Sequence, residues 1–148
     1  MSIDISGFGG LITVQTTFTF PEPVPFTQFP DDQPPFDFES IEIAEMVMGN
    51  NGDGVKWSKA VVIKMGINLI PYSTDDTTMS VLLENNRVGK GKFSAKDSIT
   101  LNIFYSNGRF KTLSGGSILA GKPAPGWESS GRLTTKDFKF GFENITGS

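Results

Sequence analysis

The stretch from Val55 to Pro71 alternates between apolar and mixed positions over an unusual length. Apart from Lys59, every odd-numbered residue before the proline is apolar, whereas the even-numbered positions include Lys56 and Lys64. This period of two predicts a β-strand with one face in water. A continuous strand of this length would reach about 50 Å, more than twice an ordinary strand. We therefore expect either a bend at Gly66 or a hairpin that projects beyond the domain.

The composition limits the classes of protein that remain. The 148 residues include no cysteine and no histidine, which excludes disulfides, thiolate or imidazole metal ligands and Ser/His/Asp catalysis. We expect a single domain over residues 1–148, with no catalytic residues, no cofactor and no metal. A net charge of −3 argues against a nucleic-acid surface. Neither a secretory leader nor an apolar run long enough for a membrane span occurs, so we expect synthesis in a cytoplasm and no membrane insertion.

Other segments carry clear patterns of secondary structure. The turn-forming sequence at residues 50–54 predicts a hairpin with the long strand. Ser73 or Thr74 can cap a helix over residues 75–86. Further strands are expected in four places: residues 11–20; residues 40–48, with apolar side chains on both faces and hence burial on both sides; residues 98–113, as a hairpin around Asn107 and Gly108; and residues 132–145, with Phe138, Phe140 and Phe142 facing inward.

Residues 21–38 form a segment rich in proline and phenylalanine. Its prolines exclude helix and sheet interior, which favours an extended loop. A solvated linker is one interpretation, but the phenylalanines would then lose the free energy of burial. We favour a loop that lies on its own domain or on a neighbouring subunit. Residues 1–10 are rich in glycine and are expected to form an arm that orders against another surface.

Several features have a more ordinary interpretation than the site they suggest. The sequence VGKGK at residues 88–92 lacks the full spacing of a phosphate-binding loop and is interpreted as a surface loop. Residues 50–54 lack the alternating carboxylates of a calcium loop. Trp127, within a loop, is interpreted as a lid over the core in preference to a platform for a ligand.

These elements predict a mainly β fold. We expect a small β-barrel or sandwich of five or six strands with one flanking α-helix, an extended Pro/Phe-rich loop and a long projecting β-hairpin. The N-terminal arm, the Pro/Phe-rich loop and the hairpin would each expose apolar groups on an isolated domain. We therefore expect the chain to associate with copies of itself.

The order of several segments resembles the tail tube proteins of contractile-tailed bacteriophages. The resemblance extends from Ile5 to Ile145 and rests on DDQPPFDF, ESIEIAEMVMGNNGDGVKWSKA, VLLENNRVGKGK and SSGRLTTKDFKFGFENI. It implies a β-barrel with a flanking helix that assembles into hexameric rings, which stack into a hollow tail tube through which DNA passes at ejection. It also implies a place in the virion and contacts with the tail sheath, baseplate and tail terminator proteins.

The same resemblance supplies candidate contact residues. Contacts between subunits and rings are expected from the arm, the loop and the hairpin, namely Phe8, Phe26, Phe29, Phe36, Phe38, Met46, Met48, Asn50, Asn51, Asp53, Val55 and Trp57. Candidates for the lumen or the outer surface are Lys56, Lys64, Asp137, Lys139 and Glu143. The alternative is a baseplate component or a β-sandwich that binds a receptor or carbohydrate, with Trp57 and Trp127 as stacking platforms.

Overall fold

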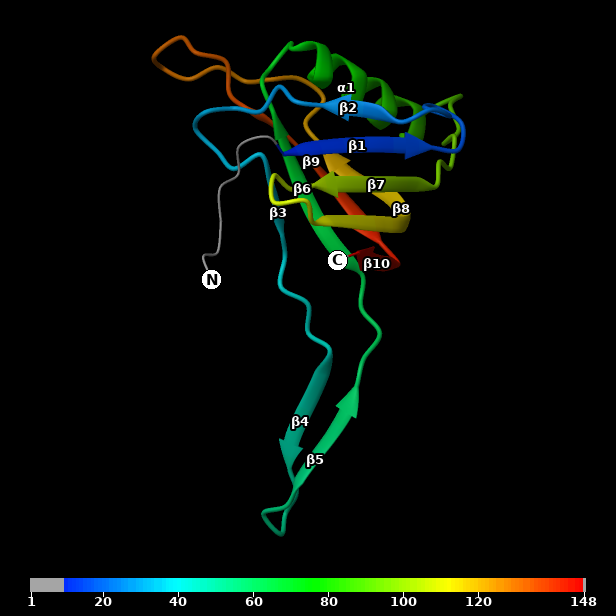
Figure 1. The fold of residues 1–148 in the computed structure, drawn as a ribbon, viewed down its shortest axis with the longest axis vertical. Coiled ribbons are helices and arrows are strands. Elements are labelled where there is room, and N and C mark those ends of the chain that lie inside the picture. Colours follow the sequence, from blue (N-terminus) through cyan, green and yellow to red (C-terminus); the bar gives the residue numbers. More distant parts are fainter. Residues whose placement is uncertain (1–9, 148) are drawn as a thin grey trace.

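The computed structural model describes residues 10–147 and shows a mainly β fold with one helix (Figure 1). Phe8 and most of the expected N-terminal arm lie outside the described residues. Ten strands are found within them, more than the five or six expected. The elements in chain order are β1 (Leu11–Thr16), β2 (Val24–Phe26), β3 (Phe36–Phe38), β4 (Ala44–Met48), β5 (Gly54–Ser58), β6 (Ile63–Leu69), α1 (Thr74–Asn86), β7 (Ile99–Phe104), β8 (Phe110–Gly121), β9 (Lys136–Phe142) and β10 (Asn144–Gly147).

The main sheet has the antiparallel order β2-β1-β7-β8-β9-β6-β3, and β10 pairs with β8. Strand β8 pairs with β7 through its first half and with β9 through its second half. Gly115, with φ of +64°, and Gly116 lie where the strand passes between the two halves, and a Cβ on Gly116 would lie 2.3 Å from the Phe142 ring. The bend folds the sheet over a common core without closing it. The expected mainly β, sandwich-like fold is confirmed, but the barrel is not closed.

The core lies between the two halves of this folded sheet. The expected inward face of β9 is confirmed, because Phe138, Phe140 and Phe142 are at most 1% exposed. Helix α1 contributes Met79 and Leu82, which are also fully buried. The helix therefore covers one end of the sandwich, as Figure 1 shows.

Helix α1 begins where its capping residue predicts. Ser73 Oγ accepts a hydrogen bond from the Asp76 backbone N–H at 3.2 Å, which satisfies one of the free donors of the first turn. Asp75 and Asp76 lie in that turn, where the helix dipole favours negative charge. The expected hairpin at Asn107 and Gly108 is also confirmed, although β8 continues well beyond the expected end at residue 113.

The Pro/Phe-rich loop lies on its own domain. Phe26 is fully buried in the core. The Asp75 carboxylate accepts hydrogen bonds from the backbone N–H groups of Thr27 and Gln28, both at 2.7 Å. Asp31 pairs with Arg132 at 2.8 Å. The expectation of a loop without strands is wrong, because β2 and β3 form there at the two ends of the sheet order, where prolines are tolerated.

The long strand expected over residues 55–71 is divided into β5 and β6. The chain that leads out through β4 and back through β5 forms two separate hydrogen-bonded ladders. The first ends where Glu39 N–H donates to Lys64 O, and the second begins where Lys59 N–H donates to Ile43 O. Between the two ladders, three residues (40–42) lie opposite four (60–63). The extra residue shifts the register of one ladder relative to the other, as a β-bulge does. Gly66 is not the bend, since the β6–β9 register runs unbroken across it.

Two expectations of burial are wrong. The strand expected over residues 40–48 begins at Ala44, and Met46 and Met48 are 67% and 68% exposed because no other element covers the hairpin. Trp127 is 79% exposed and is therefore not a lid over the core.

A buried carboxylate joins three segments beside the helix. Asp97 accepts hydrogen bonds from the backbone N–H groups of Phe18 at 2.8 Å and Thr19 at 3.0 Å, from Thr19 Oγ1 at 2.5 Å and from Asn86 Nδ2 at 2.8 Å. Burial pushes the pKa of Asp97 upward, but the hydrogen bonds from Thr19, Asn86 and Phe18 outweigh it, so the pKa lies below its ordinary value of 3.8.

Replacing Asp97 with Asn is expected to lower the free energy of unfolding at pH 7 by about 2 kcal/mol, because an amide cannot accept all these hydrogen bonds. Because the pKa of Asp97 is lower in the folded than in the unfolded state, its carboxylate stabilises the fold at pH values above its unfolded-state pKa. This stabilisation is lost as the pH falls through its folded-state pKa. The difference between Asp97→Asn and wild type should therefore narrow below pH 3.8. Urea unfolding of both proteins at pH 7 and in acid measures this difference in the free energy of unfolding. An equal difference at the two pH values would contradict the ionic role of this carboxylate.

Candidate assembly interface

A two-stranded hairpin projects from the sandwich. Strands β4 and β5 pair only with each other, and the hairpin extends below the rest of the molecule (Figure 1). None of residues 41–62 is buried. An isolated pair of strands is at best marginally stable in water, so a ribbon of this kind is stabilised when another surface covers it.

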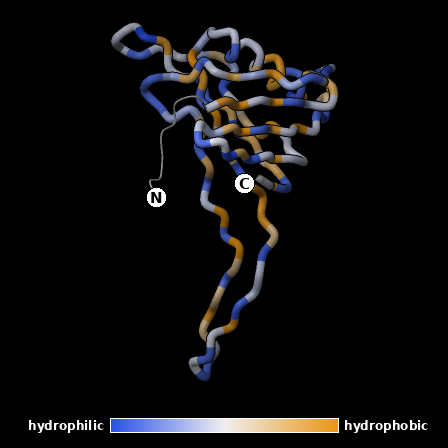
Figure 2. Tube along the Cα trace, in the orientation of Figure 1, coloured by the Kyte–Doolittle hydropathy of each residue, from blue (hydrophilic) through white to orange (hydrophobic). Residues whose placement is uncertain are grey.

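Both faces of the hairpin expose apolar side chains. Val47 lies opposite Val55, and Trp57 lies opposite Glu45 on the same face. Met46 and Met48 lie on the other face, where Met46 is opposite Lys56. Figure 2 shows the hydrophobic positions spaced along both legs. Exposed large apolar residues on the projecting segment are Ile41, Ile43, Met46, Val47, Met48, Val55, Trp57 and Val62. A patch of this kind marks a surface for another macromolecule.

The tip of the hairpin has a defined conformation. Gly49 N–H donates to Asp53 O at 2.7 Å, and Gly52 has a φ of +86°. Asn51 binds Asp53 twice, through Nδ2 to Oδ2 at 2.8 Å and through Oδ1 to the backbone N–H at 3.1 Å. The hairpin expected from residues 50–54 is confirmed, with its tip ordered in the free chain.

The expected contact residues fall on two different parts of the molecule. The hairpin carries Met46, Met48, Asn50, Asn51, Asp53, Val55 and Trp57 together. Phe29, Phe36 and Phe38 are partly buried against the core of the sandwich. Phe26 is entirely within that core. Its side chain is therefore not available to another subunit, and it does not enter the proposed contacts below.

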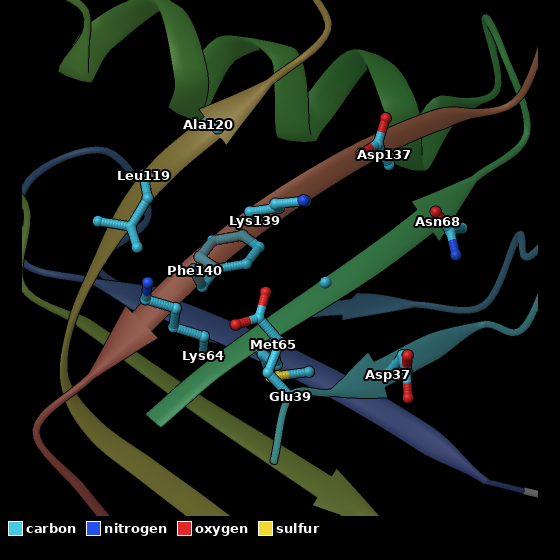
Figure 3. Close-up of a pocket in the computed structure, with 11 residues that line it drawn as sticks. Asp37, Glu39, Lys64, Met65, Asn68, Leu119, Ala120, Asp137, Lys139 and Phe140 are labelled. Atoms are coloured by element: carbon cyan, nitrogen blue, oxygen red, sulfur yellow. The ribbon is translucent and has the colours of Figure 1, made fainter. Parts of the chain in front are cut away.

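The charged residues expected on the lumen or outer surface also separate. Lys64, Asp137 and Lys139 line one shallow pocket of about 440 Å³ on the outer face of β3, β6 and β9 (Figure 3). Asp37 and Glu39 lie at the same pocket, so both signs of charge are present. Lys56 lies on the hairpin, and the Glu143 side chain lies over Gly115.

Asp137 is the one pocket residue whose carboxylate is partly enclosed and paired in the described residues. Asp137 Oδ1 is buried and makes no hydrogen bond in the described residues, although Lys122 Nζ lies 3.4 Å from it. No group of three or more acidic side chains in residues 10–147 could hold a metal ion. The only helix of this region is too short and polar to span a membrane. The hairpin is therefore the strongest candidate site of the described chain.

Other exposed apolar residues were missed by the sequence patterns. The pattern places Ile41 and Ile43 in a strand buried on both faces and Val62 on the wet face of the long strand, and all three are exposed beside the break between the two ladders. Val88 and Phe93 flank the turn that follows α1 and are 69% and 88% exposed. The uneven distribution of charge is a sequence signal that distinguishes the two regions. No lysine or arginine occurs before Lys56, so Ile41 and Ile43 lie in an acidic part of the chain and Val88 and Phe93 in a part that contains the basic residues.

Known structures share this fold. The anti-feeding prophage cap, a tube-terminating cap, has a TM-score of 0.58 at 11% identity and covers 100% of this chain and 93% of its own. The sheath/tube terminator of an extracellular contractile injection system, in the extended state, has a TM-score of 0.62 at 10% identity and covers 99% and 98%. The anti-feeding prophage baseplate has a TM-score of 0.61 at 10% identity and covers 100% and 97%.

The sequence itself matches a family of tail proteins. No curated protein sequence matches the chain. The family described as tail fiber protein gp32 matches residues 3–146, which is almost the whole chain. This confirms the expectation of a structural tail component, without assigning it to the tube. The chain belongs to the tail fiber protein gp32 family.

Proposed function

We propose that this chain assembles with copies of itself into rings, which the resemblance to tail tube proteins implies are hexameric, and that the rings stack as part of the tail tube. The observation that carries this proposal is the projecting hairpin, which exposes apolar side chains on both faces and has no core of its own. Head-to-tail contacts that repeat by a rotation close into a ring.

The shared fold supports this proposal. The similar structures are a tube-terminating cap, a sheath/tube terminator and a baseplate that was symmetrised sixfold. A further one is the sheath-tube complex of a contractile injection system, with a TM-score of 0.56. The chain covers nearly the full length of each. The proposed partners are therefore the sheath, the baseplate and the terminator of the same tail.

In this role the chain is a component of the virion, synthesised in the cytoplasm of a bacterial host. DNA would contact it only during passage through the lumen. A net charge of −3 suits a conduit, because like charge does not hold the DNA.

Sedimentation velocity and negative-stain imaging of the purified chain test this function. We expect rings of uniform diameter that stack into short tubes as the protein concentration rises. A monomer that persists at the highest soluble concentration would contradict the proposal. Assembly in low and high salt measures how much of the contact depends on charge, because ion pairs weaken with screening whereas apolar burial depends on it weakly.

A second candidate is a baseplate or receptor-binding module. Two observations favour it, namely the family description as a tail fiber protein and the 79% exposure of Trp127 on a loop. An aromatic ring of this kind can stack on a sugar. Glycan-array binding by a stable monomer, lost on Trp127→Ala, is the expected result for this candidate and would replace the ring proposal.

A further inference from the structure

The charges of this chain are divided along its sequence. Residues 1–55 contain nine acidic residues and no basic residue, whereas residues 56–148 contain thirteen basic and seven acidic residues. A net charge of −3 conceals this division. The first part supplies the outgoing leg of the hairpin, and the second part supplies the turn after α1. Opposite charge on two distant surfaces of one chain is a basis for recognition between copies.

The turn after the helix, residues 87–96, is basic and has a defined conformation. We call it the basic turn. Lys92 Nζ donates to the carbonyl oxygens of Glu84 and Arg87 at the end of α1. Gly89 and Lys92 form a backbone bridge, with N–O distances of 3.2 and 3.0 Å. The turn is therefore fixed to the helix before any partner binds.

The exposed side chains of the basic turn are of two kinds. Lys90 and Lys96 are exposed and form no ion pair within residues 10–147. Phe93 and Val88 add a large apolar surface beside them. The nearby Asp97 does not neutralise the lysines, because its carboxylate is buried and accepts the hydrogen bonds described above. The turn thus combines unpaired positive charge with apolar area.

The outgoing leg of the hairpin, residues 39–45, has the complementary composition. We call it the acidic leg. Glu42 and Glu45 share one cation, Lys59 Nζ, at 3.5 and 3.6 Å. Glu39 forms no ion pair within the described chain. Ile41 and Ile43 alternate with these acids and are exposed. The leg thus combines excess negative charge with apolar area.

The two surfaces cannot meet within one chain. Figure 1 shows the hairpin projecting below the sandwich, whereas the basic turn follows the end of α1 at the upper side. A contact between them must therefore join two copies. Since it uses different surfaces of each copy, it repeats without limit along a stack.

We propose that the basic turn of one copy binds the acidic leg of a copy in the next ring, with Phe93 and Val88 against Ile41 and Ile43. The inference rests on the proposed function, because it names the receiving surface for the hairpin. It predicts that stacking has a polarity, with every hairpin directed toward the helix end of its neighbour.

Two charge-reversed variants test this contact. One carries Lys90→Glu and Lys96→Glu in the basic turn, and the other carries Glu39→Lys and Glu42→Lys in the acidic leg. Each variant alone presents like charges at the contact, so we expect its stacking to require at least about tenfold more protein than wild type. Mixed in equal amounts, the two variants present opposite charges wherever a copy of one contacts a copy of the other, as in a stack of alternating rings. The mixture is expected to stack within about twofold of the wild-type concentration.

The outcomes separate this inference from the proposed function. A wild-type protein that never assembles contradicts the function itself. Wild-type stacking with equal stacking of the turn variant, or with no recovery in the mixture, contradicts only the contact. Far-UV circular dichroism melting checks that each variant is folded. If either is not, Phe93→Ser, which changes a side chain that is 88% exposed, replaces the charge-reversed pair as the test and is expected to weaken stacking without changing the melting temperature.

Discussion

Removal of the projecting hairpin is expected to abolish the stacking of rings while the sandwich stays folded. The last backbone bond of the upper ladder joins Glu39 to Lys64, so Ser40 and Ile63 would be the next opposed pair. Deleting residues 41–62 and inserting Asn-Gly closes this pair with a two-residue turn. None of the deleted residues is buried, and the free energy of unfolding should change by less than about 1 kcal/mol.

Assembly should respond in the opposite way. The hairpin supplies eight exposed large apolar side chains. Burying each would contribute about 1.5 kcal/mol or somewhat less, because each side chain is already partly covered in the free chain. Without them, association cannot offset its entropic cost. Analytical ultracentrifugation should show only single rings or monomers at concentrations where wild type forms tubes. Stacks formed by the shortened chain would remove the hairpin from the interface between rings.

Point variants in the full-length chain give a matched control. Trp57→Ser removes the largest apolar group of the hairpin, whereas Trp57→Leu keeps an apolar side chain at the same position opposite Glu45. We expect stacking to weaken strongly in the first variant and only slightly in the second. Equal loss in both would indicate that the indole ring itself, and not apolar burial, is recognised.

Local patterns predicted much of the sandwich because they follow directly from local geometry. The alternating phenylalanines of β9 face the core, since a strand places every second side chain on one side. Ser73 caps α1, since its hydroxyl satisfies an N–H that the helix cannot. Asn107 and Gly108 form the tight turn for a similarly local reason, as Gly108 has a φ of +87°.

Long-range features could not be predicted in the same way. The alternation of residues 55–69 runs through both β5 and β6. However, β6 lies between two neighbouring strands, β3 and β9, whereas β5 pairs only with β4. Whether an apolar face is covered depends on the path of distant segments, so Met46 and Met48 were wrongly assigned to a buried strand. The burial of Phe26 likewise depends on Asp75, which holds the adjacent backbone from a helix about fifty residues away.

The ion pair between Lys136 and Asp76 is a second long-range feature, and its loss is expected to be the most destabilising single substitution. Lys136 Nζ lies 3.1 Å from Asp76 Oδ1 and donates to Ser80 Oγ at 2.9 Å, and both charged side chains are at most 3% exposed. Lys136→Met leaves a buried carboxylate without its cation. The expected loss is about 3–5 kcal/mol of unfolding free energy.

A double-mutant cycle measures how much of this loss is due to the unpaired charge. In the wild-type protein the Tyr72 backbone N–H donates to Asp76 Oδ2 at 2.8 Å. The Asp76→Asn side chain keeps an oxygen that can accept this hydrogen bond, but the amide carries no charge. The double variant Asp76→Asn/Lys136→Met should therefore be more stable than Lys136→Met alone. Lys59→Met is the exposed control, because its partners Glu42 and Glu45 lie on the projecting hairpin, and it should cost less than about 1 kcal/mol.

This pair also connects stability to assembly. It joins the first turn of α1 to β9, and the far end of α1 carries the basic turn that we propose as the receiving surface. Loss of about 4 kcal/mol would lower the melting temperature by about 10 °C in a domain of this size. If α1 loosens from the sandwich before the sheet unfolds, hydrogen exchange in α1 should accelerate in Lys136→Met, and stacking should weaken at temperatures where the sheet is still intact. Stacking that persists until the sheet itself unfolds would show that the docking of α1 does not position the turn.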